Sequence, residues 1–170
     1  MHTADITNPQ RIRGLAAYDL FNPELEKKLI AVCQRTAEHL DVQTVMVTAV
    51  LDSATAFVAT NHHEDGVPID VSDAPNEISL CPILVRTREP YVVDDLTTHP
   101  EHATNLLVEA GVMQAYAGVP VILPSGDVLG SFSAASPEPH HFTDADIATL
   151  TATVDEIIEL IREYEFARQH

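Results

Sequence analysis

The most constraining feature of the chain is a pair of apolar segments separated by a short turn. Residues 112–123 and 128–135 are rich in Val, Ala and Leu, and Pro124-Ser125-Gly126-Asp127 lies between them. Gly accepts a positive φ and Pro presets a turn position, so this junction is typical of a β-hairpin. Hairpins place neighbouring strands antiparallel, and the chain therefore predicts a mostly antiparallel sheet.

Helix signals stand at both ends of the predicted strands. Asn22-Pro23 provides an N-cap followed by Pro at the first helical position, which predicts a helix over about 23–40. Thr143 with Asp146 three residues later approaches a capping box and predicts the start of the last helix.

The last predicted helix has an apolar residue at every third or fourth position. The series, spaced as a heptad, is Ile147, Leu150, Val154, Ile157, Ile161 and Tyr164. A helix over 143–168 would be about 39 Å long, whereas a typical strand covers about 17–20 Å. We therefore expect this helix to overhang the domain and to form a homodimer through Ile147, Leu150, Val154, Ile157 and Ile161. The preferred dimer is a four-helix arrangement of 22–40 and 143–168 from two chains.

The middle of the chain alternates short strands, loops and helices. The expected elements are strands at 43–50 and 54–60, a loop at 61–75, a helix at 79–87, a strand at 90–93, and a helix at 100–110 stopped by Gly111. The predicted fold is α+β: a central, mostly antiparallel sheet of five or six strands, flanked by helices, with the N- and C-terminal helices packed together. We expect an N-terminal extension over 1–21 and one domain over 22–168.

Several short motifs carry a family resemblance. In chain order they are Ser79-Leu80-Cys81-Pro82, Pro90-Tyr91-Val92-Val93-Asp94-Asp95, Asn105-Leu106-Leu107-Val108, Tyr116-Ala117-Gly118-Val119-Pro120 and Phe142-Thr143-Asp144-Ala145-Asp146. Together they resemble the GAF domain family, in the form of a stand-alone bacterial GAF domain protein, over about 22–164.

This resemblance implies a GAF/PAS-like fold and a sensory or regulatory role in signal transduction. It implies a small-molecule ligand seated between the sheet and the segments 61–85 and 94–110. Ligand binding would then shift the population of helix packings, and a downstream signalling protein would read the change. The resemblance selects no particular ligand or cofactor, because members of the family bind different molecules or none.

Composition excludes several classes of partner. The net charge is −17 with only 21% charged residues, which disfavours nucleic acid and anionic membrane surfaces. No apolar run is long enough to cross a bilayer, and the first residues lack the apolar core of a signal peptide. The two cysteines, Cys33 and Cys81, suit a reducing compartment. We therefore expect an acidic cytoplasmic protein.

Seven residues form the candidate ligand site. They are Phe57, Cys81, Asp94, Asp95, Tyr116, Val119 and Phe132. The four large side chains among them are expected on the pocket side of the sheet, with plain core packing as the alternative.

The remaining three candidates have a structural alternative each. Cys81 at a helix start could be a reactive thiol, although a small buried apolar side chain is the preferred interpretation. Asp94 and Asp95 point to opposite sides if their strand continues, so they cannot form an acid/base pair. One of them is expected to cap the following segment.

An enzyme and a ligand-free scaffold are the alternative functions. GAF enzymes that reduce free methionine sulfoxide use a cysteine before the hairpin and resolving cysteines, but this chain has none between Asp94 and Tyr116. No catalytic residue is therefore assigned. His99 and His102 could share a helix face as haem or metal ligands, yet surface histidines are preferred and no metal site is assigned. In the scaffold alternative, the protein's own side chains fill the pocket.

Overall fold

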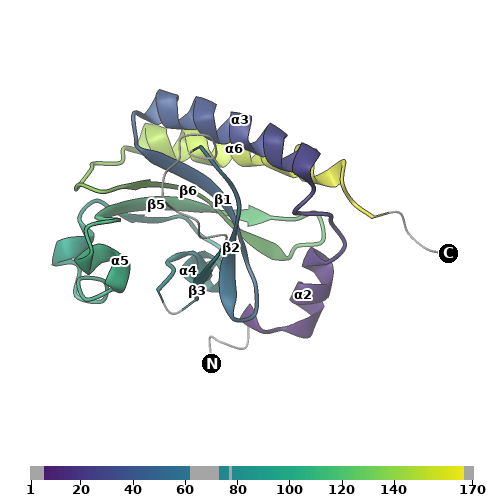
Figure 1. Cartoon of the computed structure of the whole chain (residues 1–170), viewed down its shortest axis with the longest axis horizontal. Helices are drawn as coiled ribbons and strands as arrows, with labels where there is room; N and C mark the ends of the chain where they lie inside the picture. Colours follow the sequence, from purple (N-terminus) through teal and green to yellow (C-terminus); the bar gives the residue numbers. More distant parts are fainter. Residues whose placement is uncertain (1–5, 62–72, 77, 167–170) are drawn as a thin grey trace.

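The chain folds around one six-stranded sheet (Figure 1). The computed structural model describes residues 6–61, 73–76 and 78–166. The strands are β1 (Thr44–Val50), β2 (Ala54–Thr60), β3 (Asp73–Pro75), β4 (Tyr91–Val93), β5 (Ala115–Ile122) and β6 (Val128–Ser136). Their order in the sheet is β3-β2-β1-β6-β5-β4, with every neighbouring pair antiparallel. The predicted α+β fold is confirmed.

Helices cover both faces of this sheet. They are α2 (Pro9–Leu15), α3 (Pro23–Leu40), α4 (Cys81–Thr87), α5 (Leu106–Glu109) and α6 (Asp144–Arg162), with a short 3-10 helix, η1 (Leu96–Thr98). Figure 1 shows α3 and α6 side by side on one face, with α4 and α5 on the other. The terminal helices α3 and α6 thus pack together as predicted. None of the described helices has the length and apolar character needed to cross a bilayer.

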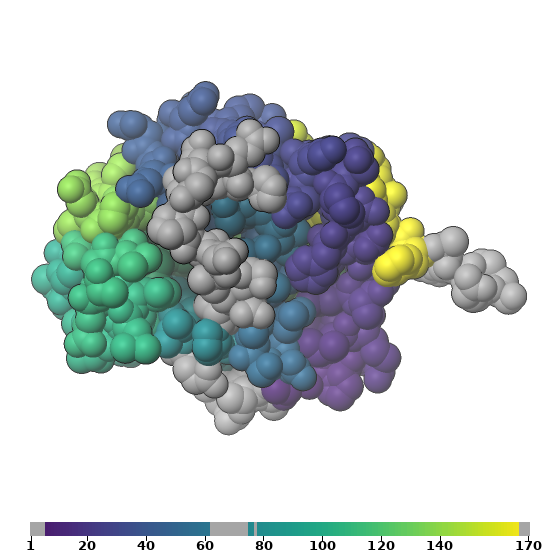
Figure 2. Space-filling view, in the orientation of Figure 1, coloured from purple at the N-terminus to yellow at the C-terminus, as the bar shows by residue number. Residues whose placement is uncertain are grey.

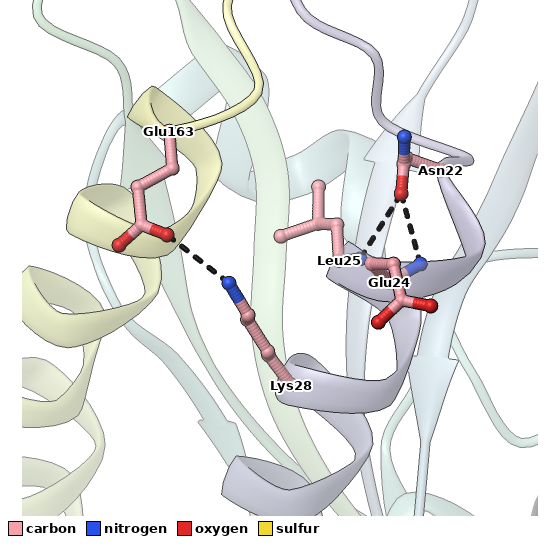
Figure 3. A network of polar contacts seen from close by, with 5 residues as sticks. All are labelled: Asn22, Glu24, Leu25, Lys28 and Glu163. Atoms are coloured by element: carbon pink, nitrogen blue, oxygen red, sulfur yellow. Dashed lines mark hydrogen bonds and ion pairs between the residues drawn. The ribbon is translucent and has the colours of Figure 1, made fainter.

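The start of α3 follows its sequence signals (Figure 3). Asn22 Oδ1 accepts hydrogen bonds from the backbone amides of Glu24 and Leu25 at 2.8 and 3.4 Å, and Pro23 occupies the first helical position. These bonds satisfy amides that the first turn of a helix leaves without partners. On the outer side of the helix, Lys28 Nζ lies 3.1 Å from Glu163 Oε1 at the end of α6.

The last helix is shorter than predicted. Its capping box between Thr143 and Asp146 is present, but α6 ends at Arg162. Nineteen residues give a helix of about 28 Å, and the nine residues of β6 span about 30 Å. The predicted overhang is wrong, because the strands beneath α6 are longer than the typical strand and match the helix in length.

The apolar series on α6 lies inside this chain's own core. Leu150, Ile157 and Ile161 have no exposed surface, Val154 is 8% exposed, and Ile147 packs against the same cluster from its margin. Their partners come from α3 and from the sheet face beneath. The prediction that this series binds a second copy is therefore wrong, because the sheet and α3 already cover it.

Backbone hydrogen bonds join the segment before α3 to the segment after α6. Asp19 N donates to Tyr164 O and Phe166 N to Ala17 O, both at 2.9 Å, next to an antiparallel bridge between Tyr18 and Glu165. This bridge takes residues 164–166 out of the predicted helix.

Part of the predicted N-terminal extension belongs to the packed body. Figure 2 shows α2 (purple) continuous with the surface of the rest of the molecule. Leu15, Tyr18 and Leu20 are buried in the main core cluster. Arg11 is 5% exposed and donates to the carbonyl oxygens of Val128, Leu129, Val50 and Ile6. We retain 22–168 as the expected extent of the domain, with α2 packed against it.

Two segments of the middle differ from the prediction. The helix expected over 100–110 is only α5, because Asn105 accepts from Leu107 N and starts a new helix after a run of turns. Gly111, at φ +74, ends it as expected. The segment 61–75 was expected to be a loop, but it contains β3; its residues 62–72 lie outside the described part of the chain.

Candidate functional site

Five side chains that carry a hydroxyl or a thiol meet in the core beneath α4. We call this group the hydroxyl cluster; its members are Thr48, Cys81, Tyr116, Ser131 and Ser133. Each of them is at most 4% exposed. The group is continuous, since every member lies within hydrogen-bond distance of at least one other.

Ser131 is the centre of the hydroxyl cluster. Its Oγ lies 2.6 Å from Ser133 Oγ, 2.9 Å from Thr48 Oγ1 and 3.1 Å from Cys81 Sγ. Ser133 Oγ lies in turn 2.7 Å from Tyr116 Oη, which is 3.6 Å from the same thiol. Among the described residues, no buried side-chain nitrogen or oxygen lacks a hydrogen-bond partner.

Strand alternation produces the hydroxyl cluster. In β6, Ser131 and Ser133 face α4 while Phe132 between them faces α3 and α6. Gly118 in β5 pairs with Ser133 and leaves the room that the cluster needs. A Cβ at Gly118 would stand 2.5 Å from Tyr116 Oη and 2.8 Å from Ser133 Oγ.

Burial keeps the Tyr116 hydroxyl neutral. Desolvation, the largest cause, raises the pKa of Tyr116 well above its usual value, so its hydroxyl stays protonated at neutral pH. Hydroxyls both donate and accept hydrogen bonds. The four hydroxyls of the cluster therefore provide neutral hydrogen-bond donors and acceptors that are paired with one another.

Tyr91 and His102 extend this region toward the surface. Tyr91 Oη lies 2.6 Å from His102 Nε2, and the rings of Tyr91 and Tyr116 are 6.5 Å apart. His99 stacks on His102 at 4.3 Å. Burial, the main cause, lowers the pKa of His102, which favours the neutral ring.

The two histidines differ from the sequence expectation. Neither lies in a regular α-helix, so they do not share a helix face, and His102 is 7% exposed rather than a surface side chain. Within the described ranges, no three His, Cys, Asp or Glu side chains are grouped so that they could hold a metal ion.

The predicted large side chains lie on two different faces. Tyr116 contacts the α4 side, and Phe57 shares that face because it pairs with Thr48 across β1 and β2. Val119 and Phe132 belong to the cluster under α3 and α6 instead. Their predicted placement beside Tyr116 is wrong, since odd and even positions of one strand point to opposite faces.

Asp95 caps the segment that follows it, as predicted for one of the two acids, whereas Asp94 bonds residues distant in the sequence. Asp94 Oδ1 accepts from Phe142 N at 3.1 Å, and its Oδ2 lies 2.7 Å from His141 Nδ1. Asp95 Oδ1 accepts from Thr97 N at 3.0 Å and caps η1. The hydrogen bond from His141 is the largest cause lowering the pKa of Asp94, and the same bond raises the pKa of His141.

The two cysteines are on opposite sides of the sheet. Cys81 belongs to the hydroxyl cluster, whereas Cys33 is fully buried on the inner face of α3 and contacts Ala59 O. Burial raises the pKa of Cys33 to about 12. No second thiol of the same chain can therefore reach Cys81 without rearrangement of the sheet.

The surface of the described part of the protein has hollows at the end of α3 and beside α6. One, of about 540 Å³, lies at the end of α3 and is lined by Gln34, Ala37, Glu38, Asp41, Val42 and Asn61. The other, of about 300 Å³, lies between α6 and the β4–β5 edge and is lined by Pro90, Val119, Pro120, Ile122, Thr151, Val154, Asp155 and Ile158. Of the seven predicted site residues, only Val119 lines either hollow.

Comparison with known families and structures agrees with this fold. The family model of the GAF domain matches residues 24–159, and the chain therefore belongs to the GAF domain family. None of the curated proteins gives a significant match.

Solved structures with the same fold come from proteins of different function. One is the type II free methionine-R-sulfoxide reductase from Thermoplasma acidophilum, with TM-score 0.67 and 20% identity, covering 86% of this chain and 98% of that one. Another is the GAF domain of an Acinetobacter phosphoenolpyruvate-protein phosphotransferase, with TM-score 0.67 and 14% identity over 91% and 89%. A third is a red/green cyanobacteriochrome in its red light-absorbing state, with TM-score 0.69 and 17% identity over 86% and 99%. At sequence identities this low, the likeness shows that the chains share a fold and nothing more.

Proposed function

We propose that the chain is a regulatory GAF module of a bacterial signal-transduction system and that it binds a small, neutral, polar ligand on the α4 face of its sheet. The hydroxyl cluster is the observation that carries this proposal. The ligand would sit between the sheet and the described parts of the segments 61–85 and 94–110, with Phe57, Cys81 and Tyr116 among its contacts.

The energetic cost of the hydroxyl cluster supports a binding role. A buried hydroxyl must recover the hydrogen bonds it loses to water, so an apolar side chain of similar size at the same place is often as good for stability. The opposite face of the same strands is apolar. A ligand that exchanges hydrogen bonds with Ser131, Ser133 and Tyr116 would favour one packing of α4 and α5 over another.

Native mass spectrometry of freshly purified protein tests this proposal. We expect an additional mass from a retained small molecule, which solvent extraction and chromatography would then identify. The double variant Tyr116→Phe, Ser133→Ala should lose it, because the variant removes two of the converging hydroxyls. Thr36→Val, which removes a buried hydroxyl on α3, should keep it.

If mass spectrometry detects no retained molecule, a second measurement is needed. Thermal-shift screening against nucleosides, sugars, amino acids and amides should then reveal a stabilising compound that acts on the wild type and not on the double variant. If neither measurement gives binding, the ligand-free scaffold is the better account, with the hydroxyl cluster filling its own pocket.

Free methionine sulfoxide reduction is the second candidate, because a solved reductase has the same fold. The separation of Cys33 from Cys81 across the sheet counts against it. An NADPH-coupled assay with thioredoxin should show no turnover above background. Turnover that disappears in Cys81→Ser would overturn this expectation and identify an enzyme.

Homodimerisation and a cytoplasmic location remain parts of the proposal. Both cysteines are free thiols, which supports a reducing compartment. A dimer would have to use outer surfaces, since α3 and α6 bury their apolar faces within one chain and join their outer sides through Lys28–Glu163 and Arg35–Glu156. Light scattering at micromolar concentration should give twice the chain mass; a strictly monomeric particle would contradict the dimer.

A further inference from the structure

The groove between α6 and the β4–β5 edge has the make-up of a recognition site. Val119 and Val154 are buried and form its floor, while Pro120, Ile122 and Ile158 are half-buried along its sides. Its volume of about 300 Å³ is at the lower end for small-molecule pockets. That size suits one or two apolar side chains of a partner.

Two prolines explain why the sheet is open here. β4 pairs with β5 only from Tyr91 to Val93, opposite Gly118 to Tyr116. Pro90 precedes β4 and lines the groove, and Pro120 stands beyond Gly118 on β5. Proline has no backbone N–H, so neither residue can donate to a continued ladder. Among the described residues, no strand pairs with Val119 to Ile122 on the side of β5 that faces away from β6.

An acidic side chain at the rim of the groove favours a partner with a cationic side chain. On α6, Glu156 pairs with Arg35 and Glu159 pairs with Arg162. Asp155, on the rim of the groove and exposed, has no ion pair with any described residue. A cationic side chain of a partner could complete this pair at the protein surface.

A second copy of the chain fits this groove poorly. Each copy has a net charge of −17, so a second copy offers this groove a surface dominated by acids and few cations to pair with Asp155. A basic partner is attracted by the same charge, and the missing backbone donors mean that its side chains must supply most of the affinity.

We propose that this groove binds a short segment of another protein in which one or two apolar side chains are flanked by Lys or Arg. The apolar side chains lie over Val119 and Val154, and a flanking cation pairs with Asp155. This surface is on the α6 side of the sheet, away from the hydroxyl cluster, and the proposal goes beyond ligand binding on the α4 face.

A labelled peptide of sequence KKLIKK tests the proposal with the whole chain. Titration should shift the backbone amide resonances of Val119, Val121, Ile122 and residues 151–158, and fluorescence anisotropy gives the affinity. Thr151→Trp, which fills the groove, should weaken binding by about tenfold or more. Ala152→Trp, at the neighbouring exposed position of α6, should leave it unchanged.

Charge is tested separately. Asp155→Lys should weaken KKLIKK binding by about twofold to fivefold more than Asp52→Lys, which makes the same charge change at an exposed turn. The peptides KKSSKK and EELIEE should not shift the groove amides. The proposal is overturned by equal binding of KKSSKK, by binding that Thr151→Trp leaves intact, by shifts confined to other surfaces, or by self-association of the unliganded chain through these same amides.

Discussion

The two faces of the sheet differ in chemistry although the same strands build both. Toward α3 and α6 the strands present a continuous apolar layer that includes Val45, Val47 and Phe132. Toward α4 they present the hydroxyl cluster between two smaller apolar groups. β6 alone contributes Phe132 to one face and its two neighbouring serines to the other.

The two faces of one strand can therefore have different roles. Because successive side chains alternate, a strand can supply stability with one set of positions and polar recognition with the other. Burying the apolar layer favours folding by roughly 25 cal/mol for each Å² removed from water. The hydroxyl cluster adds little to the free energy of unfolding and instead fixes the positions of its hydrogen-bond donors and acceptors.

The largest effect should follow from a charge placed in the apolar layer. Ile161→Lys buries an ammonium group with no partner and should cost about 5 kcal/mol or more, enough to unfold a domain of ordinary stability. Circular dichroism should show loss of folded structure. Ala152→Lys, exposed on the same helix, should stay folded; a folded Ile161→Lys protein would show that this face is not core.

A cavity in the same layer should cost less. Leu150→Ala removes a fully buried side chain and should lower the free energy of unfolding by about 2–5 kcal/mol. Urea denaturation gives the value. A loss below about 1 kcal/mol would mean that the α6 side is no better packed than the surface.

Removing one hydroxyl on the other face should have a smaller effect on stability. Tyr116→Phe keeps the ring and leaves Ser133 bonded to Ser131, so the expected cost is about 1 kcal/mol. Urea denaturation compared with Leu150→Ala measures the contrast between the faces. A cost equal to that of Leu150→Ala would show that the hydroxyl cluster is a main source of stability.

The smallest effect concerns the pair of Asp94 and His141, which are 44% and 78% exposed. The pKa of His141 is raised from 6.5, so its contribution is present below that pH and is lost as pH rises through the raised value. The pKa of Asp94 is lowered from 3.8, so its contribution is present above that pH and is lost as pH falls through the lowered value. The pair therefore stabilises most between about pH 3.8 and 6.5.

The free energy of unfolding should be lower for His141→Ala than for the wild type at low pH, and this difference should shrink as pH rises. Unfolding by urea at pH 5.5 should separate the two proteins, and unfolding at pH 8.5 should not. His39→Ala, an exposed histidine on α3 without a carboxylate pair among the described residues, is the matched control. A constant difference across this range would rule out the ion pair as its cause.

Local signals predicted most of the fold. The Asn22 cap, the Thr143 capping box and the Gly126 turn act within a few residues, and each is present. The α6 overhang was mispredicted because helix length was compared with a typical strand, while β6 has nine residues. A heptad-like spacing also occurs on any helix that packs one face on a sheet.

The candidate site was only partly predictable. Cys81 and Tyr116 were found and do meet, but Val119 and Phe132 were assigned to the wrong face because residue size carries no information on strand register. Ser131, Ser133 and Thr48 were missed. The two serines that flank Phe132 could have indicated this cluster from the sequence. Buried polar side chains on one face of a strand need hydrogen-bond partners there.

The bridge between residues 17–19 and 164–166 has a mechanical consequence. Two backbone hydrogen bonds hold these segments together at 2.9 Å, and Figure 1 shows α2 and the C-terminal end of α6 on the same side of the molecule. A pull applied at residue 166 therefore loads this bridge before it reaches α6. A pull from the N-terminal side is resisted earlier, by Arg11 of α2, which donates to the carbonyl oxygens of Val50, Val128 and Leu129. The two sides of the bridge thus differ in their resistance to force.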